Sequence, residues 1–175
     1  MAASYRLVRK NTLVIAEEIG EEHYGFSASG VTRTVAQTLV HIALSHRLQY
    51  HWHGVEHRSN LEGFDFPAFF LPLIEEEKTP RSKQQILTML KEDGEKFASW
   101  LEGLSDEFLG ETVTFPAGMT PPCKSRFEMI LGVKEHEMHH RAQLMVLQRM
   151  IGLEPHLTRE MNARFAAMMA ARATA

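Results

Sequence analysis

The chain contains a single cysteine, Cys123, among its 175 residues. One thiol excludes an intrachain disulfide, so the fold has to depend on a hydrophobic core. A chain of this length can bury such a core in one domain. We therefore expect a single domain over residues 1–175 and place Cys123 in a loop.

Long apolar runs and basic runs are also missing. No stretch of 18 apolar residues occurs and the N-terminus has no apolar signal segment, so we expect neither a membrane span nor export. The net charge is −3 and no cluster of lysine and arginine stands out, which argues against a nucleic-acid surface. We expect a cytoplasmic protein that acts on a small molecule.

Histidine, in contrast, is abundant, with ten residues in the chain. Three of them lie in residues 125–152, which we predict to be one long helix because Ser125 and Glu128 form a capping box and a glycine ends the segment. His136 and His140 are four residues apart, so they lie on one face of this helix, one turn from each other. The rest of that face is apolar, so both side chains point toward the core.

Two imidazoles placed in this way can share one divalent metal ion. The alternative is that both are core histidines that hydrogen-bond to carbonyl or carboxylate groups. A third inward-facing ligand from another segment would favour the metal site.

Four further helices are predicted from capping residues and apolar spacing. They cover residues 4–19, a segment from Thr32 or Thr34 to about residue 57, residues 82–103, and a last segment that begins at Thr158. The connections at 58–81 and 104–124 are predicted to be irregular. Three prolines limit the first connection to a short helical turn, and ETVTF is a strand-like run in the second.

Five helices with almost no sheet indicate an all-α protein. Four long helices with two crossovers favour a four-helix bundle, with an additional C-terminal helix packed outside it or at a dimer contact. Metal sites in such bundles are built from side chains of facing helices.

His41 lies in the middle of the apolar stripe of the second predicted helix, between Gln37 and Leu44. Together with His136 and His140 it would form a three-histidine site with open coordination positions, which is typical of catalytic rather than structural metal sites. Neutral ligands leave the ion its full charge, and this charge lowers the pKa of a bound water or thiol. Imidazole suits zinc, nickel, copper or iron.

Two segments resemble a known family. The segment HEMHHRAQLMVLQRMIG is similar to the C-terminal signature of the DinB-like (DinB/YfiT) metal-dependent enzymes, with an alanine in place of the usual glycine and with matches at His136, His140, Arg141 and Gln143. The segment TVAQTLVHIALSH resembles the family's second-helix motif and matches it at His41.

The resemblance implies an up-down-down-up four-helix bundle, a divalent metal at His41, His136 and His140, and often a homodimer. Family activities include S-transfer with low-molecular-weight thiols such as bacillithiol or mycothiol, and hydrolase or isomerase reactions. We therefore expect a metal-dependent transferase or hydrolase that binds zinc or nickel. The alternative is a non-catalytic, stress-related bundle whose metal is structural or adventitious.

A competing pattern overlaps the same residues. The run from His136 to His140 also fits HExxH, the zincin protease motif, in which Glu137 would be the general base and Glu160 a third ligand. This interpretation leaves His41 without a role, and the chain lacks a convincing sheet to bind a peptide. In the DinB-like interpretation Glu137 accepts a hydrogen bond behind the ligands, accepts a proton from a water near the site, or is a solvent-facing carboxylate.

Other polar residues near these positions have more open roles. Gln143, one turn after His140, is one candidate for a hydrogen bond near the site, whereas His139 points about 100° away and is not expected to be a ligand. Tyr50 and Trp52 either line a pocket or pack in the core. A solvated or partly exposed position is expected for the remaining histidines of the second helix: His46, His51, His53 and His57.

Overall fold

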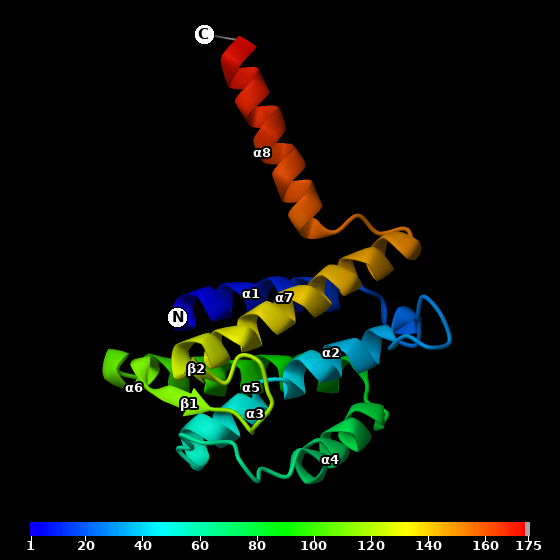
Figure 1. Cartoon of the computed structure of the whole chain (residues 1–175). Helices are drawn as coiled ribbons and strands as arrows, with labels where there is room; N and C mark the ends of the chain where they lie inside the picture. The colour runs from blue at the N-terminus through cyan, green and yellow to red at the C-terminus, as the bar shows by residue number, and fades with distance from the viewer. Residues whose placement is uncertain (174–175) are drawn as a thin grey trace.

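Four helices form the body of the protein in the computed structural model, which describes residues 1–173 (Figure 1). They are α1 (Ala2–Glu18), α2 (Val35–Leu44), α5 (Lys83–Glu102) and α7 (Arg126–Met150). Helices α5 and α7 each pack against both α1 and α2, so the four form a closed ring in cross-section. α1 and α7 run in one direction and α2 and α5 in the other (Figure 1). The predicted up-down-down-up four-helix bundle is confirmed.

The remaining elements connect these four helices or, in the case of the C-terminal helix, follow the last of them. They are a 3₁₀ turn (Glu21–His23), α3 (Arg47–Tyr50), a π-helical turn (His51–Val55), α4 (Phe66–Lys78), α6 (Asp106–Gly110), the strands β1 (Thr112–Thr114) and β2 (Cys123–Ser125), and the C-terminal α8 (His156–Ala173). No helix within residues 1–173 is both long enough and apolar enough to cross a membrane.

The core lies inside the ring of four helices. Each helix contributes at least one side chain with no exposed surface: Ile15 from α1, Leu39 from α2, Ile86 from α5 and Leu144 from α7. Burying a side chain of this size stabilises the fold by about 1.5–3 kcal/mol. Leu39 lies two residues before His41 and Leu144 four residues after His140, so the candidate site borders this core.

Three of these helices begin with reciprocal caps. Thr34 and Gln37 at α2, Ser82 and Gln85 at α5, and Ser125 and Glu128 at α7 each form a capping box. The predicted starts of the second, third and fourth bundle helices are therefore confirmed, and the earlier of the two proposed caps for α2, Thr32, is not used.

The second helix was predicted to run unbroken to about residue 57, and this is wrong. α2 ends at Leu44, and after a turn the chain continues as α3 and the π-helical turn. The hydroxyl of Ser45 donates a hydrogen bond to the carbonyl of Ile42 at 2.8 Å, so it competes with the backbone for that acceptor. This break lies one turn after His41.

The connection at 58–81 was predicted to be irregular, and this is wrong. It contains the 13-residue helix α4, capped by Asp65, whose side chain accepts from the Ala68 N–H at 2.9 Å. Pro67 falls in the first turn, where the N–H has no partner within the helix and its loss is harmless. Pro72 lies in the interior of α4, where it removes one backbone hydrogen bond without ending the helix. No residue of α4 is buried.

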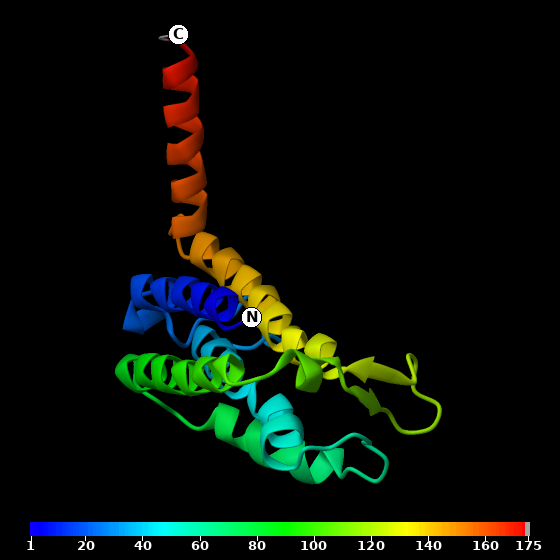
Figure 2. The same cartoon turned by 90° about the vertical axis from the view of Figure 1, so that its left-hand side faces the viewer.

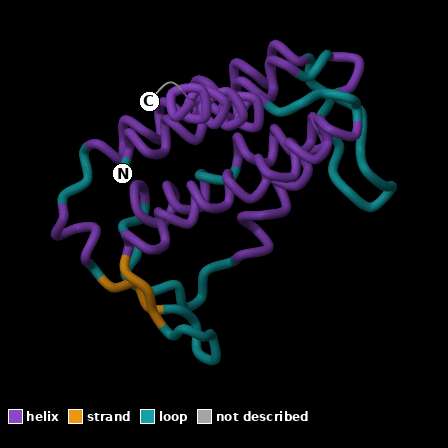
Figure 3. The backbone as a smooth tube through the Cα atoms, turned by 90° about the horizontal axis from the view of Figure 1, so that it is seen from above, coloured by secondary structure: helices purple, strands orange, loops and turns teal. Residues whose placement is uncertain are grey.

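The strand-like run ETVTF forms β1, which pairs antiparallel with β2 in a register that sets Val113 opposite Lys124. This strand pair lies at one end of the bundle (Figure 3). Cys123 was predicted to lie in a loop. It is exposed but belongs to β2.

Helix α8 is the additional C-terminal helix expected from the sequence. It projects away from the bundle in two perpendicular views (Figures 1 and 2). Its large apolar side chains are exposed, among them Met161, Phe165 and Met168. They are therefore not part of the core of this chain.

Candidate metal centre

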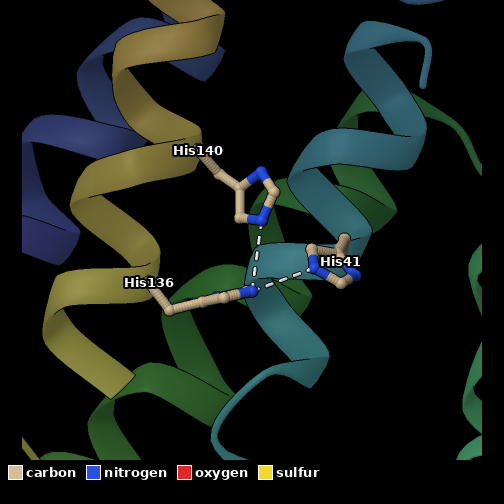
Figure 4. Close-up of side chains that lie close together, drawn as sticks. All are labelled: His41, His136 and His140. Atoms are coloured by element: carbon tan, nitrogen blue, oxygen red, sulfur yellow. Dashed lines mark hydrogen bonds between the residues drawn. The ribbon is translucent and has the colours of Figure 1, made fainter. Parts of the chain in front are cut away.

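The three predicted ligands lie together. His41 comes from α2, and His136 and His140 come from successive turns of α7 (Figure 4). The Nε2 atom of His136 lies 3.1 Å from the Nε2 of His41 and 3.1 Å from the Nε2 of His140. One nitrogen from each ring lies within 4.8 Å of the other two, so the three side chains can hold a metal ion.

Two of the rings are oriented by partners on their other nitrogen. His41 Nδ1 lies 2.9 Å from Glu77 Oε2, and His140 Nδ1 lies 2.8 Å from Gln143 Oε1. Both partners are acceptors, so each Nδ1 donates its proton and each neutral ring presents an unprotonated Nε2. Gln143, which the sequence offered as one candidate, therefore does hydrogen-bond at the site.

His136 completes this arrangement. Its Nε2 faces both unprotonated Nε2 atoms, and a single proton on it can satisfy only one of them. Its Nδ1 is buried and has no hydrogen-bond partner within residues 1–173. Three nitrogen lone pairs that converge from two helices are the donor set of a three-histidine metal site with open positions, so the residues present fit a divalent ion.

Burial keeps the rings of His136 and His140 neutral. Burial is the main cause that lowers the pKa of His136 to about 4, and the neighbouring His140 and His41 rings add to it. The pKa of His140 is also lowered, mainly by burial, although its hydrogen bond with Gln143 opposes the change. A metal ligand has to be deprotonated, so both rings are in the ligand form at neutral pH.

Glu77 of α4 is the residue that sequence reasoning missed. It accepts from His41 on one oxygen and from the Arg33 guanidinium on the other. Burial acts to raise the pKa of Glu77, but the hydrogen bonds from His41 and Arg33 outweigh it and hold the pKa below its usual range. A carboxylate behind a ligating histidine fixes its tautomer and raises its basicity.

Two cavities border the histidines. One, of about 360 Å³, is lined by His41 and His136 and lies between α2, α3, α4 and α7. The other, of about 760 Å³, is lined by His140 and Gln143 and extends under the loop at residues 28–33. Arg33, Ile74 and Glu77 line both. The candidate centre therefore lies where the two cavities meet.

Glu137 is neither solvent-facing nor directed at the histidines. It has no exposed surface, and both of its oxygens accept hydrogen bonds from the Arg9 guanidinium of α1 at 2.9–3.1 Å. Arg9 also donates to Tyr5 Oη and to the carbonyl of Leu90. The prediction that Glu137 is a solvent-facing carboxylate is wrong. The prediction that Glu137 takes part in catalysis is not tested by this geometry.

The zincin alternative gains no support from the geometry. Glu160, its proposed third ligand, is exposed on α8 and pairs with Arg164. The group of described side chains that can hold a metal contains His41 and not Glu160. His139 is exposed and contacts Gln143 at 3.1 Å, as expected for a residue that does not bind the metal.

The remaining candidates lie outside the centre. Trp52 packs against Phe64 and Phe66 in a core cluster, and Tyr50 is exposed against Trp100. His46 and His53 are buried, which corrects the expectation of a solvated face, whereas His51 is partly exposed and His57 exposed. Both ring nitrogens of the buried His53 have partners, since Arg126 donates to its Nδ1 at 2.8 Å and Gln49 hydrogen-bonds to its Nε2.

The comparison with solved structures supports the fold. The chain is similar to a DinB-like protein of Bacillus subtilis, YjoA, at 20% identity with a TM-score of 0.61, over 86% of this chain and 91% of that one. It is also similar to YfiT of Bacillus subtilis, described as a probable metal-dependent hydrolase with an unusual four-helix bundle topology. The identity to YfiT is 18% and the TM-score 0.65, over 87% of this chain and 86% of that one.

No curated protein sequence matches the chain. The family model of the DinB superfamily, however, matches residues 4–144, which include most of α1, all of α2 and α5, and the histidines of α7. The match covers most of the chain and both segments that supply the candidate ligands. The chain belongs to the DinB superfamily.

Proposed function

We propose that this protein is a metal-dependent hydrolase in which His41, His136 and His140 bind one divalent metal ion. The observation that carries the proposal is the convergence of the three Nε2 atoms, two of which are held unprotonated by Glu77 and Gln143. The description of YfiT as a probable metal-dependent hydrolase is consistent with it.

The residues around the centre have separate tasks in this proposal. A metal ion held by three imidazoles lowers the pKa of a water molecule at an open position toward neutrality and so supplies a nucleophile. Glu77 and Gln143 fix the orientation of His41 and His140. Helix α4 covers the centre with Ile74 and Glu77 and limits the access of bulk water.

Zinc and nickel are the ions we propose. The ligands are all imidazoles, which suit both metals, and the site offers fewer than the four protein ligands of a closed structural zinc site. Cavities on both sides of the histidines give a substrate access, so the arrangement supports an enzyme over a non-catalytic bundle with a structural metal.

Thiol transfer is a second candidate reaction because there are two cavities. A transfer to or from a low-molecular-weight thiol needs room for two reactants at one ion. The larger cavity is bordered by Lys78, Thr32 and Gln143, which suit a polar thiol, and the smaller one has a largely apolar wall that includes Leu44, Phe70 and Met129. An ion held by His41, His136 and His140 would favour the deprotonated form of such a thiol, and the smaller cavity would hold the second reactant.

A homodimer is also part of the proposal. One face of α8 carries exposed apolar residues at helical spacing: Met161, Phe165, Met168 and Met169. A second copy of the chain would cover this face. Sedimentation should give a dimer for the wild type and a monomer for Met161→Lys/Phe165→Lys, and a monomeric wild type would overturn this part of the proposal.

The hydrolase proposal is tested with metal-free protein reloaded with zinc or nickel. A panel of aryl esters and amides should be hydrolysed in proportion to the metal bound, and His41→Ala and His136→Ala should lose both metal and activity. Added bacillithiol, mycothiol or glutathione with an electrophile tests transfer in the same samples. Hydrolysis that is equal with and without metal would contradict the proposal, and thiol consumption without hydrolysis would favour the second reaction.

A further inference from the structure

Gly132 lies in the middle of α7, four residues before His136. A glycine in a helix interior is about 1 kcal/mol less favourable than an alanine. Packing does not require it here, because a Cβ atom at this position would meet nothing within 4 Å. The contrast is Gly94 in α5, where a Cβ atom would lie 2.7 Å from the Arg9 guanidinium. The close approach of Arg9 explains why a glycine occupies position 94, but no neighbouring atom explains the glycine at position 132.

The space beside Gly132 is the smaller cavity, of about 360 Å³. Gly132 and His136 lie on the same face of α7, one turn apart, and both line this cavity. The missing side chain therefore leaves room next to a candidate metal ligand. A larger residue at 132 would fill the part of the cavity that adjoins the histidines.

The other walls of this cavity are mainly apolar. α2 and α3 contribute Leu44 and Leu48, α7 contributes Met129 and Val133, and α4 contributes Phe70, Leu73 and Ile74. Phe70 and Ile74 are 38% and 45% exposed, so α4 presents apolar surface here without filling the space. The uncharged polar side chains of the lining, Ser45 and Gln49, already hydrogen-bond to the Ile42 carbonyl and to His53.

The charged residues at the border of the cavity are already paired. Arg33 forms an ion pair with Glu77, and Glu77 also accepts from His41. Their opposite charges compensate each other, so the border favours an uncharged occupant. The volume is that of a small-molecule site, and a dry cavity of only about 150 Å³ lined by apolar side chains is enough to hold benzene.

We propose that this cavity binds an uncharged apolar group of the substrate, a single aromatic ring or a short alkyl chain, and that Gly132 makes room for it beside His136. This inference deepens the proposed function and rests on it for the position of the reacting group. Gly132 is in this account a specificity-determining residue: it sets how large the apolar group is that reaches the metal centre.

The test compares Gly132→Leu with Ala142→Leu. Ala142 is an exposed residue of the same helix and lines neither cavity, so its variant adds a similar apolar side chain outside the site. The probe is fluorobenzene, a neutral single-ring compound, whose fluorine NMR signal is followed as metal-free protein is titrated in. We expect the wild type and Ala142→Leu to bind it equally and Gly132→Leu to bind it at least about tenfold more weakly, since an apolar pocket depends on its free volume.

A second variant and a second measurement keep the test decisive. Gly132→Ala adds one carbon without a clash, so it should fold at least as well as the wild type and lower probe affinity by a smaller factor. Zinc affinity should be equal in Gly132→Ala, Gly132→Leu and the wild type. His136→Ala should lose zinc and keep the probe.

The outcomes separate the two proposals. Probe binding that is unchanged in both Gly132 variants, or absent from the wild type, would overturn the apolar pocket. If the wild type fails to bind zinc but the Gly132 variants bind the probe more weakly as expected, the metal-dependent function is contradicted and the apolar pocket is supported. For the metal-loaded enzyme, we expect Gly132→Leu to lose activity on hexanoyl esters more than on acetyl esters.

Discussion

Glu77 of α4 accepts a hydrogen bond from His41 of α2 at 2.9 Å, although α4 is not one of the four bundle helices. The candidate centre is therefore built from two layers. α2 and α7 supply the three imidazoles, and a connecting helix orients one of them. A carboxylate in this position controls which nitrogen of His41 faces the site.

Removing this carboxylate should weaken metal binding without unfolding the protein. We expect Glu77→Gln and Glu77→Ala to bind zinc about 10–100-fold more weakly, the range found for partners that orient metal-binding histidines. Competition with a chromophoric chelator measures the affinity. Glu75→Gln is the matched control because Glu75 lies on the same helix and its carboxylate pairs with Lys78 at the surface. Equal affinities in all four proteins would show that His41 needs no partner.

We expect Glu137 to stabilise the fold through its ion pair with Arg9 and to take no part in the reaction. In Glu137→Gln the Arg9 guanidinium loses the carboxylate that neutralises it, and breaking a buried ion pair in this way costs about 3–5 kcal/mol. Urea unfolding measures the loss, with Glu135→Gln, an exposed position on the same helix, as control. A Glu137→Gln protein as stable as the wild type but unable to hydrolyse its substrate would instead identify Glu137 as a catalytic base.

The two helix-interior glycines should respond in opposite directions to alanine. Gly94→Ala places its Cβ against Arg9, which is held by Glu137 and by the carbonyl of Leu90, and should lower the free energy of unfolding by about 1–3 kcal/mol. Gly132→Ala meets open space and should raise it by about 0.5–1 kcal/mol. Thermal and urea unfolding check both values. Two shifts of the same sign would contradict this account of the glycines.

Acid should destabilise the metal-free protein through its buried histidines. Burial, with Arg9 near His46 and Arg126 near His53, lowers the pKa of each ring from 6.5 to about 4. Between these values the unfolded chain binds protons that the folded chain does not, so stability is full above pH 6.5 and is lost as the pH falls toward 4. The loss is on the order of 3 kcal/mol for each histidine.

Urea unfolding from pH 7 to pH 4 measures this loss. His53→Gln removes one of the titrating rings, so its unfolding free energy should fall less steeply over the same interval than that of the wild type. Identical slopes for the two proteins would mean that His53 is not held neutral by its position beside Arg126.

The sequence was sufficient where local patterns decide the structure. The capping boxes at Ser82 and Ser125 set the starts of α5 and α7, and the four-residue spacing of His136 and His140 set their common face. His41 could be found because it interrupts an apolar stripe that points into the bundle. The break after Leu44 depends on a hydroxyl–carbonyl hydrogen bond that propensity does not reveal.

The sequence was insufficient where residues distant in the chain meet. Glu77 is 36 residues from His41, and it lies on a helix whose two prolines hide its periodicity. The partner of Glu137 is Arg9, 128 residues away, and no local pattern connects them. For the same reason a buried ion pair and a solvent-facing carboxylate could not be told apart at Glu137 before the packing of α1 against α7 was known.

Metal content is the most direct test of the central claim, measured by elemental analysis on protein purified without a histidine tag. The proteins are the wild type, His41→Ala, His136→Ala, His140→Ala and Glu160→Ala. We predict about one zinc or nickel ion per chain in the wild type and in Glu160→Ala, and a loss of metal in all three histidine variants. Metal kept in His41→Ala and lost in Glu160→Ala, or a wild type that takes up neither zinc nor nickel, would contradict the three-histidine centre.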